Sequence, residues 1–358
     1  MPSNSANFTT TIDNPYLPLT PGTTFYYESD DGSETIRFEV TRKTKIVDGV
    51  ECVVVLDRVY DENGALIEKT YDYFAQDKDG NVWYFGEDVK NYVDGVFHDT
   101  KGSWLAGVAG AEAGIIMKAS PVPGETYSQE NAPGVAADAA TVLSLDARAN
   151  TPYAKFDPTL KTYEFSPLEP ALKENKFYAA GLGFVRVKDL ASQGQGESLV
   201  RIEFDGTDEA ETIAGNVGRD ILRGHGGNDE IRGLAGDDTL IGGNDADLLI
   251  GGRGRDMFQF DFAKESGNGP GARDTIADFR PVQDRIDLSG IDADRDAAGN
   301  QGFHFIGSDK FGGSAGELRT KGDGGGMLIL GDTDGDRHAD FRIKVKGANS
   351  LEAGDFVL

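Results

Sequence analysis

Six consecutive nine-residue units between Gly206 and Gln259 constrain most strongly what this chain can fold into. The units read GTDEAETIA, GNVGRDILR, GHGGNDEIR, GLAGDDTLI, GGNDADLLI and GGRGRDMFQ. The sixth position of each unit is acidic and the eighth is apolar. The acidic residues are Glu211, Asp220, Asp229, Asp238, Asp247 and Asp256, and the apolar ones are Ile213, Leu222, Ile231, Leu240, Leu249 and Phe258. Because a disordered linker needs no periodic apolar position, the repeat predicts a stacked, folded structure.

Each unit combines a glycine-rich turn with a short strand. Glycine adopts positive φ at little cost, so such turns can bring backbone carbonyls close together. The apolar eighth position points inward, and stacked units bury a thin core that a single unit could not bury alone. Since two units complete one coil, turns on the same edge come from residues eighteen apart. The acidic residues therefore meet in two rows: Glu211, Asp229 and Asp247 in one, and Asp220, Asp238 and Asp256 in the other.

Carboxylates aligned in this way repel one another unless cations separate them. Ca²⁺ accepts roughly six to eight oxygen ligands from carboxylates and carbonyls, so the rows predict several bound calcium ions. The expected pairs are Asp220 with Asp238, Asp229 with Asp247, and Asp238 with Asp256. The expected carbonyl ligands are Gly215, Gly218, Gly224, Gly227, Gly233, Gly236, Gly242, Gly243, Gly251, Gly252 and Gly254. The Glu211–Asp229 position departs from the pattern, since Glu209 and Glu211 replace glycine and aspartate, and Asp245 replaces a turn glycine in the fifth unit.

The register Gly-Gly-X-Gly-X-Asp-X-apolar-X resembles the nonapeptide of RTX proteins, which form a calcium-binding parallel β-roll. Downstream, the segments RDTIADF, QDRIDLSGID and GDTDGDRHADFRIKVKG resemble, in that order, the C-terminal module of serralysin-type secreted proteases. The resemblance covers residues 206–358. It implies that Asp274 and Asp284 also bind calcium, although either residue could instead cap a turn. The closing Asp355-Phe356-Val357-Leu358 resembles the uncleaved terminal signal of type I secretion.

Composition limits the partners and the compartment. A net charge of −26 and a pI near 4.4 argue against nucleic acid and against an anionic membrane surface. No apolar run is long enough for a membrane span, and the opening residues have neither a basic start nor an apolar stretch typical of a classical export signal. We expect a secreted, extracellular protein whose partners are calcium ions and the type I secretion machinery. Cys52, the single cysteine, allows no intrachain disulfide.

Two shorter motifs lie in the C-terminal part. Asp332, Asp334, Asp336 and Asp340 follow a D-x-D-x-D-x-x-x-D pattern that looks like half of an EF-hand-type loop, but Arg337 stands where that loop needs glycine. A metal site and a solvated hairpin turn both remain open there. The G-x-S-x-G around Ser314 lacks the strand-to-helix setting of a hydrolase nucleophile and is not expected to be one.

The sequence predicts an all-β chain in three parts. Residues 1–204 form an antiparallel sheet or barrel-like domain, 205–259 the parallel β-roll, and 260–358 a β-rich C-terminal module. Asp79-Gly80 and Asp94-Gly95 mark hairpins, and 134–140 is the one stretch that favours a short helix. The predicted N-terminal strands are 23–29, 34–42, 51–60, 65–76, 81–86, 90–98, 113–119, 141–147, 159–166, 174–188 and 198–204.

The best candidate for chemistry in the N-terminal part is the hairpin YDYFAQDKDGNVWYFGED. Asp72 lies inside a strand, where aspartate is disfavoured, and a carboxylate among aromatic rings would have a raised pKa suited to acid/base catalysis. A four-residue loop would place Asp72 opposite Phe85, whereas a three-residue loop with a bulge would bring up Tyr84. We take Asp72, Glu87 and Tyr84 as catalytic candidates, and Trp83, Phe85 and Tyr73 as rings that could stack on substrate. An aromatic core strip with Asp72 and Glu87 at its rim is the alternative.

Two functions fit this N-terminal domain. The first is an extracellular hydrolase or lyase acting on small molecules or polymer fragments, such as glycans or aryl ethers of the plant wall. The second is a binding or surface-interaction module without chemistry. A zinc metalloprotease is excluded, because H-E-x-x-H is absent and His98 is the only histidine before residue 205. Degradative enzymes are common in the resembled family, which favours the first by analogy.

Overall fold

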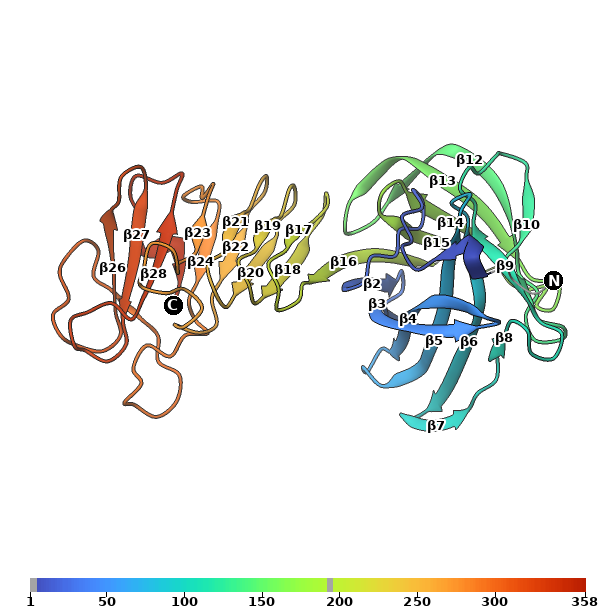
Figure 1. Ribbon diagram of the computed structural model, residues 1–358, viewed down its shortest axis with the longest axis horizontal. Helices are drawn as coiled ribbons and strands as arrows, with labels where there is room; N and C mark the ends of the chain where they lie inside the picture. Colours follow the sequence, from blue (N-terminus) through green and yellow to red (C-terminus); the bar gives the residue numbers. More distant parts are fainter. Residues whose placement is uncertain (1–4, 192–195) are drawn as a thin grey trace. The chain divides into compact units, whose positions relative to one another are not determined.

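The computed structural model describes residues 5–191 and 196–358, and it separates into two compact units with the boundary between Arg201 and Ile202. Strands dominate both units (Figure 1). In the described ranges there is no α-helix, only two 3₁₀ turns at Ser5–Asn7 and Ala353–Asp355. Within those ranges, no helix has the length and apolarity of a membrane span. The all-β prediction is therefore confirmed.

The N-terminal unit is a bent antiparallel sheet that nearly closes on itself. Strands β2 to β6 form a meander, and β12 to β16 form a second one. Pairing of β16 with β2 joins the two meanders along one edge. The strands are β1 (Phe8–Thr9), β2 (Thr23–Ser29), β3 (Glu34–Val47), β4 (Val50–Asp61), β5 (Leu66–Asp77), β6 (Val82–Val93), β7 (Val96–Asp99), β8 (Trp104–Leu105), β9 (Glu112–Met117), β10 (Thr126–Ser128), β11 (Glu130–Asn131), β12 (Ala139–Asn150), β13 (Lys155–Phe165), β14 (Lys173–Ala179), β15 (Gly183–Asp189) and β16 (Glu197–Asp205).

Several predicted boundaries in this unit were wrong. The stretch 174–188 is two strands, β14 and β15, because the chain turns at Gly181 and Gly183, both of which have positive φ. The stretches 81–86 and 90–98 are divided differently, as the long β6 and the short β7 joined by the Asp94-Gly95 turn. Residues 134–140 contain no helix and instead make a turn that leads into β12.

The nine-residue repeat forms a parallel β-roll with two faces (Figure 1). On one face β18 (Asp220–His225), β20 (Thr239–Gly243) and β22 (Met257–Gln259) pair in parallel, and on the other β17 (Thr212–Ala214), β19 (Glu230–Arg232) and β21 (Leu248–Ile250) do so. Partners such as Leu222 and Leu240 are separated by the expected eighteen residues. Both rows of carboxylates therefore lie along the edges of the roll.

The eighth position supplies the core of the roll, as predicted. Leu222, Ile231, Leu240, Leu249 and Phe258 are completely buried. The second and fourth positions of the third to sixth units have positive φ, which explains the preference for glycine there. The residues at these positions are His225, Gly227, Leu234, Gly236, Gly243, Asp245, Gly252 and Gly254.

The C-terminal module extends both faces of the roll. On one face β24 (Arg285–Asp287) and β29 (Phe356–Val357) continue from β22. On the other, β23 (Thr275–Ile276) pairs with β28 (Phe341–Val345), followed by β27 (Met327–Asp332), β26 (Glu317–Gly322) and β25 (His304–Phe305). Ile276, Ile286 and Phe341 join the buried residues of the repeat in one continuous core.

We predict that Val282→Gly stabilises the protein. Val282 has a φ of 73° and its side chain is 84% exposed. A β-branched residue in this region is strained, whereas glycine is not, and little packing is lost. We expect the free energy of unfolding to rise by about 1 kcal/mol in urea titrations at saturating calcium. Val217→Gly is the matched control, because Val217 is also exposed but lacks a positive φ, and it should be neutral or destabilising. Equal losses in both variants would contradict this account.

Candidate functional site

The repeat aspartates are joined in two ladders of hydrogen bonds that run along the roll. In one, the amide of Asp220 donates to Oδ1 of Asp238 at 2.9 Å, and the amide of Asp238 donates to Oδ1 of Asp256 at 3.2 Å. In the other, the amide of Asp229 donates to Oδ1 of Asp247 at 2.8 Å. The amide of Glu211 extends this second ladder at its start by donating to Oδ1 of Asp229 at 2.8 Å. Each pair expected to share a calcium ion therefore lies side by side.

Both ladders continue beyond the repeat to the two aspartates implied by the family resemblance. The amide of Asp247 donates to Oδ1 of Asp274 at 2.9 Å, and the amide of Asp256 donates to Oδ1 of Asp284 at 3.1 Å. Asp274 and Asp284 are almost completely buried. They occupy the next step of each row, so the spacing of eighteen residues widens to 27 and 28 without breaking the rows.

In four of these aspartates, the described residues supply no hydrogen-bond donor to the second carboxylate oxygen, Oδ2. Oδ2 of Asp229, Asp238, Asp247 and Asp274 is buried and, among the described residues, has no hydrogen-bond partner. Burial raises the pKa of Asp238 to about 8 and that of Asp247 to about 7. A buried carboxylate oxygen without a partner costs on the order of 1–3 kcal/mol or more. The rows therefore require a positive charge from elsewhere.

Backbone carbonyls approach the same edges closely, as the glycine pattern predicts. A Cβ on Gly233 would lie 2.5 Å from Oδ2 of Asp238 and 2.5 Å from the carbonyl oxygen of Gly251. A Cβ on Gly236 would overlap the carbonyl of Gly218, and one on Gly254 would overlap the carbonyl of Gly236. Glycine is required where backbones come this near. The edges thus gather carboxylate and carbonyl oxygens, the donor set that Ca²⁺ prefers.

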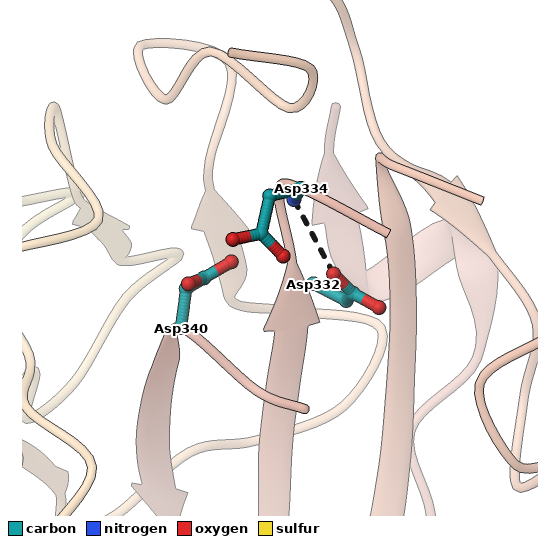
Figure 2. A group of neighbouring side chains, drawn as sticks. All are labelled: Asp332, Asp334 and Asp340. Atoms are coloured by element: carbon teal, nitrogen blue, oxygen red, sulfur yellow. Dashed lines mark hydrogen bonds between the residues drawn. The ribbon is translucent and has the colours of Figure 1, made fainter. Parts of the chain in front are cut away.

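The aspartate loop at 332–340 brings three side chains close together (Figure 2). Carboxylate oxygens of Asp332, Asp334 and Asp340 lie within 4.8 Å of one another. However, Asp332 accepts the amides of Gly335 at 2.7 Å and Arg337 at 2.9 Å. The guanidinium of Arg295 donates to Asp334 at 3.0 Å and to Asp340 at 2.7 Å. These contacts agree with the hairpin-turn reading, since the carboxylates already have donors and a counter-charge.

In the N-terminal unit the structure brings together the three catalytic candidates. The hydroxyl of Tyr84 donates to Oδ1 of Asp72 at 2.6 Å, and Glu87 lies directly opposite Asp72 on β6. Neither predicted register included this pairing. Phe74 faces Tyr84 near the turn, and a bulge at Gly86, which has a φ of 121°, then shifts the register by one residue. A side chain at Gly86 would overlap the carbonyl of Trp104 on β8.

The environment of these carboxyls favours their protonated form. Burial raises the pKa of Asp72 to about 7, partly offset by the Tyr84 hydrogen bond. Burial and the charges of Asp72 and Glu130 raise the pKa of Glu87 to about 9. Burial likewise raises the pKa of Glu130 to about 8. Such groups can donate a proton at neutral pH, which exposed carboxyls cannot.

The three proposed stacking rings lie on the other face of the hairpin. Trp83 and Phe85 both contact Phe8 of β1, with ring centroids 6.1 and 5.3 Å apart. The hydroxyl of Tyr73 donates to Asp88 at 2.5 Å, also away from Asp72. Because side chains alternate along a strand, these rings do not gather around the Asp72 carboxylate. Phe74, stacked on Tyr84 at 4.9 Å, occupies that side instead.

A cavity of about 380 Å³ lies on the same face of the sheet as Asp72. Its wall is mainly apolar and includes Phe74 from the hairpin. Asp57, Glu174, Lys176 and Glu197 are the charged residues that line it. The remaining lining residues are Leu17, Pro18, Leu19, Phe25, Tyr27, Ile36, Phe38, Val59, Ile116, Tyr178, Leu182, Gly183, Phe184 and Val187.

Sequence reasoning missed the charged groups of this cavity. Burial and the charge of Asp72 hold the pKa of Asp57 well above its usual range, and Oδ1 of Asp57 is buried without a partner among the described residues. Lys176 pairs with Glu164 at 2.9 Å and with Glu174 at 3.7 Å. Asp57 follows the apolar run CVVVL in β4, so the rule that singled out Asp72, an aspartate inside a strand, could have found it.

Comparison with known proteins matches residues 211–358 to the family described as peptidase M10 serralysin C terminal. The AlgE6R3 subunit of the mannuronan C5-epimerase from Azotobacter vinelandii is 31% identical, with 42% of this chain and 80% of that chain covered and a TM-score of 0.32. An exported protein with a YmcC-like fold from Bacteroides fragilis is 16% identical, with 52% and 98% covered and a TM-score of 0.30. No curated protein sequence matches the chain.

Asp238 lies in the middle of its row, so Asp238→Asn tests whether the rows bind calcium. We expect the variant to bind fewer calcium ions and to melt at a lower temperature than wild type in calcium. In EGTA the order should reverse, because the neutral amide removes a buried charge that lacks a cation. Equilibrium dialysis and circular dichroism melting measure both effects.

Asp237→Asn is the control for this experiment, since the Asp237 carboxylate pairs with the exposed Arg255. It should keep the calcium count of the wild type. An Asp238→Asn protein that matched wild type in calcium count and in both melting curves would refute the assignment.

The buried carboxyls of the N-terminal unit predict a stability that falls as pH rises. Their folded pKa values, about 7 for Asp72 and about 9 for Glu87, exceed unfolded values near 4. The folded state therefore binds more protons between these limits, and ionisation at higher pH costs stability. We expect a loss on the order of a few kcal/mol between pH 6 and pH 9.

Tryptophan fluorescence during urea unfolding reports this loss selectively, because both tryptophans, Trp83 and Trp104, belong to the N-terminal unit. Calcium should be held at saturation throughout. Asp72→Asn should flatten the pH dependence relative to the exposed control Glu62→Gln. A stability that rises from pH 6 to pH 9 would show that these carboxyls are not held protonated.

Proposed function

We propose that this protein is a secreted extracellular enzyme. The premise is that the chain belongs to the RTX-type calcium-binding proteins through its serralysin-type C-terminal module. Type I export would deliver the chain to a calcium-rich medium. Calcium would bind there between Asp220 and Asp238, Asp229 and Asp247, and Asp238 and Asp256, and metal binding would supply folding free energy. The N-terminal unit would act as a hydrolase or lyase on small molecules or polymer fragments.

One observation carries the enzymatic part of the proposal. The apolar cavity of the N-terminal unit contains a carboxyl group, Asp57, whose pKa is held well above its usual range. A second lining carboxyl, Glu197, has its pKa raised to about 7 by burial. Titratable groups with perturbed pKa values that face a concave apolar pocket are typical of acid/base catalytic sites.

The roles follow from position. Asp57 lines the cavity and would transfer the proton to or from substrate. Asp72 lies on the neighbouring strand, diagonal to Asp57 on the same face, because Val55 pairs with Asp72 and Asp57 pairs with Thr70. With its partners Tyr84 and Glu87 it would sustain the raised pKa of Asp57. In this proposal Asp72 and Glu87 complete the carboxyl cluster and Tyr84 donates a hydrogen bond to it. Phe74 takes the stacking role first considered for Trp83, Phe85 and Tyr73.

The cavity favours a neutral aromatic or aliphatic substrate. Its charged lining comprises three acids, Asp57, Glu174 and Glu197, against one base, Lys176. An anionic glycan would find no available positive charge in this lining, because Lys176 is already paired with Glu164 and Glu174. A neutral sugar would find few polar partners on the apolar wall. An aryl ether or aryl ester fragment of the plant wall suits both the wall and a carboxylic acid donor. We therefore favour aryl substrates over glycans.

A binding module without chemistry is the second candidate. The observation that favours it is that Lys176 is already paired with Glu164 and Glu174, so part of the charged lining is satisfied internally. In that case the cavity would hold an apolar ligand, and the protonated carboxyls would only orient it. Turnover distinguishes the two functions, because a binder shows saturable binding without product.

The test is turnover of neutral aryl ethers, aryl esters and aryl glycosides by the full chain in calcium. We expect activity on an aryl ether or ester, and a fall in kcat of roughly a hundredfold or more in Asp57→Asn. Asp72→Asn should lower kcat less and shift the pH profile, since it acts through Asp57. Glu62→Gln, on the surface of the same unit, should match wild type.

Two results would overturn the proposal. Full turnover in both Asp57→Asn and Asp72→Asn would remove the carboxyls from the mechanism. Binding of an aryl ether in thermal-shift assays, with no turnover on any compound tested, would establish the binding module instead.

A further inference from the structure

Arg280 projects its guanidinium into the end of one carboxylate row. Its Nη2 donates to the carbonyl oxygen of Gly254 at 2.8 Å, to Oδ2 of Asp256 at 3.1 Å and to Oδ1 of Asp284 at 3.2 Å. Both aspartates are almost completely buried. Gly254 and Asp256 belong to the last turn of the repeat and Asp284 to the loop that follows it, so a single nitrogen bridges these two segments.

The preceding step of the same row presents the same set of oxygens. There the equivalent atoms are the carbonyl oxygen of Gly236, Oδ2 of Asp238 and Oδ1 of Asp256, each eighteen residues earlier or one ladder step back. The two turns share their backbone conformation, since Gly236 and Gly254 have φ values of 142° and 131°. They differ in one respect. In the part of the chain that the structure describes, Oδ2 of Asp238 has no partner, whereas Oδ2 of Asp256 has Arg280.

We propose that Arg280 occupies the last cation position of this row, so that a guanidinium replaces the calcium ion between Asp256 and Asp284. The row would then bind metal at its earlier steps and end on a charge that the chain itself supplies. An arginine suits the position because it stays protonated and offers several donors to carboxylate oxygens in a rigid planar fork.

The loop that carries Arg280 holds it in register. The amide of Arg280 donates to Oδ2 of Asp284 at 2.8 Å, and the amide of Asp284 donates back to the carbonyl of Arg280 at 2.9 Å. The arginine therefore meets Asp284 through both its backbone and its side chain.

The other row ends differently, which gives an internal comparison. Its last step joins Asp247 to Asp274, and the described residues provide no hydrogen-bond donor for Oδ2 of either carboxylate. The row that ends at Asp274 thus still requires a cation at its last step, whereas the row that ends at Asp284 does not.

The test compares wild type with Arg280→Ala in the full chain. We expect the variant to bind one more calcium ion per chain in equilibrium dialysis with atomic absorption, because the vacated oxygens accept metal. Its melting temperature should be close to that of wild type at saturating calcium and clearly lower in EGTA. Arg255→Ala removes the same charge from an exposed pair with Asp237 and should leave the calcium count unchanged.

A second measurement is independent of how well the variant folds. Anomalous scattering from wild-type crystals grown in calcium should show no cation between Asp256 and Asp284, with peaks present at earlier steps of the rows. A cation at that position with Arg280 displaced would overturn the proposal. So would an Arg280→Ala protein that binds the same number of ions as wild type, or one that remains unstable at saturating calcium.

Discussion

The C-terminal unit depends on one electrostatic problem, that of buried carboxylate oxygens which the protein leaves without donors. Every turn of the roll uses Oδ1 to bind the amide of the preceding turn, and this bond sets the stacking distance. In Asp229, Asp238, Asp247 and Asp274, Oδ2 is buried and the described residues offer it no donor. A cation is then a structural element, since without it the stacking that buries Leu240 and Leu249 also buries uncompensated charge.

The N-terminal unit also contains carboxyls removed from water, but there protonation avoids the cost of burying a negative charge. Asp72 is buried, Glu87 and Glu130 are partly buried, and the hydroxyl of Tyr84 donates to Asp72. Burial favours the neutral acid, and the pKa rises. The same residue types thus lie beside backbone carbonyls in a periodic glycine-rich frame and have raised pKa values in an aromatic sheet.

The repeat could be predicted closely because its constraint is periodic and local. A nine-residue spacing fixes which side chain is buried, which turn takes positive φ and which carboxylates are neighbours, and the structure agrees at Leu222, Asp238 and Gly236. The pairing of Asp72 with Glu87 could not be predicted, because it depends on a bulge at Gly86, where the backbone closely approaches the carbonyl of Trp104 on another strand. The cavity had the same difficulty, since Asp57 and Lys176 come from strands more than a hundred residues apart.

The position of Arg280 in a carboxylate row could not be predicted from the nine-residue period. The residue lies outside the repeat, in a segment where the family resemblance implied calcium binding by Asp284, with a turn-capping role as the alternative. Its side chain supplies the charge that the pattern demands, but by a different chemical group. A row of ligands read from sequence therefore gives the number of cationic positions rather than the number of metal ions. The two numbers differ wherever a neighbouring loop carries an arginine that can reach a carbonyl such as that of Gly254.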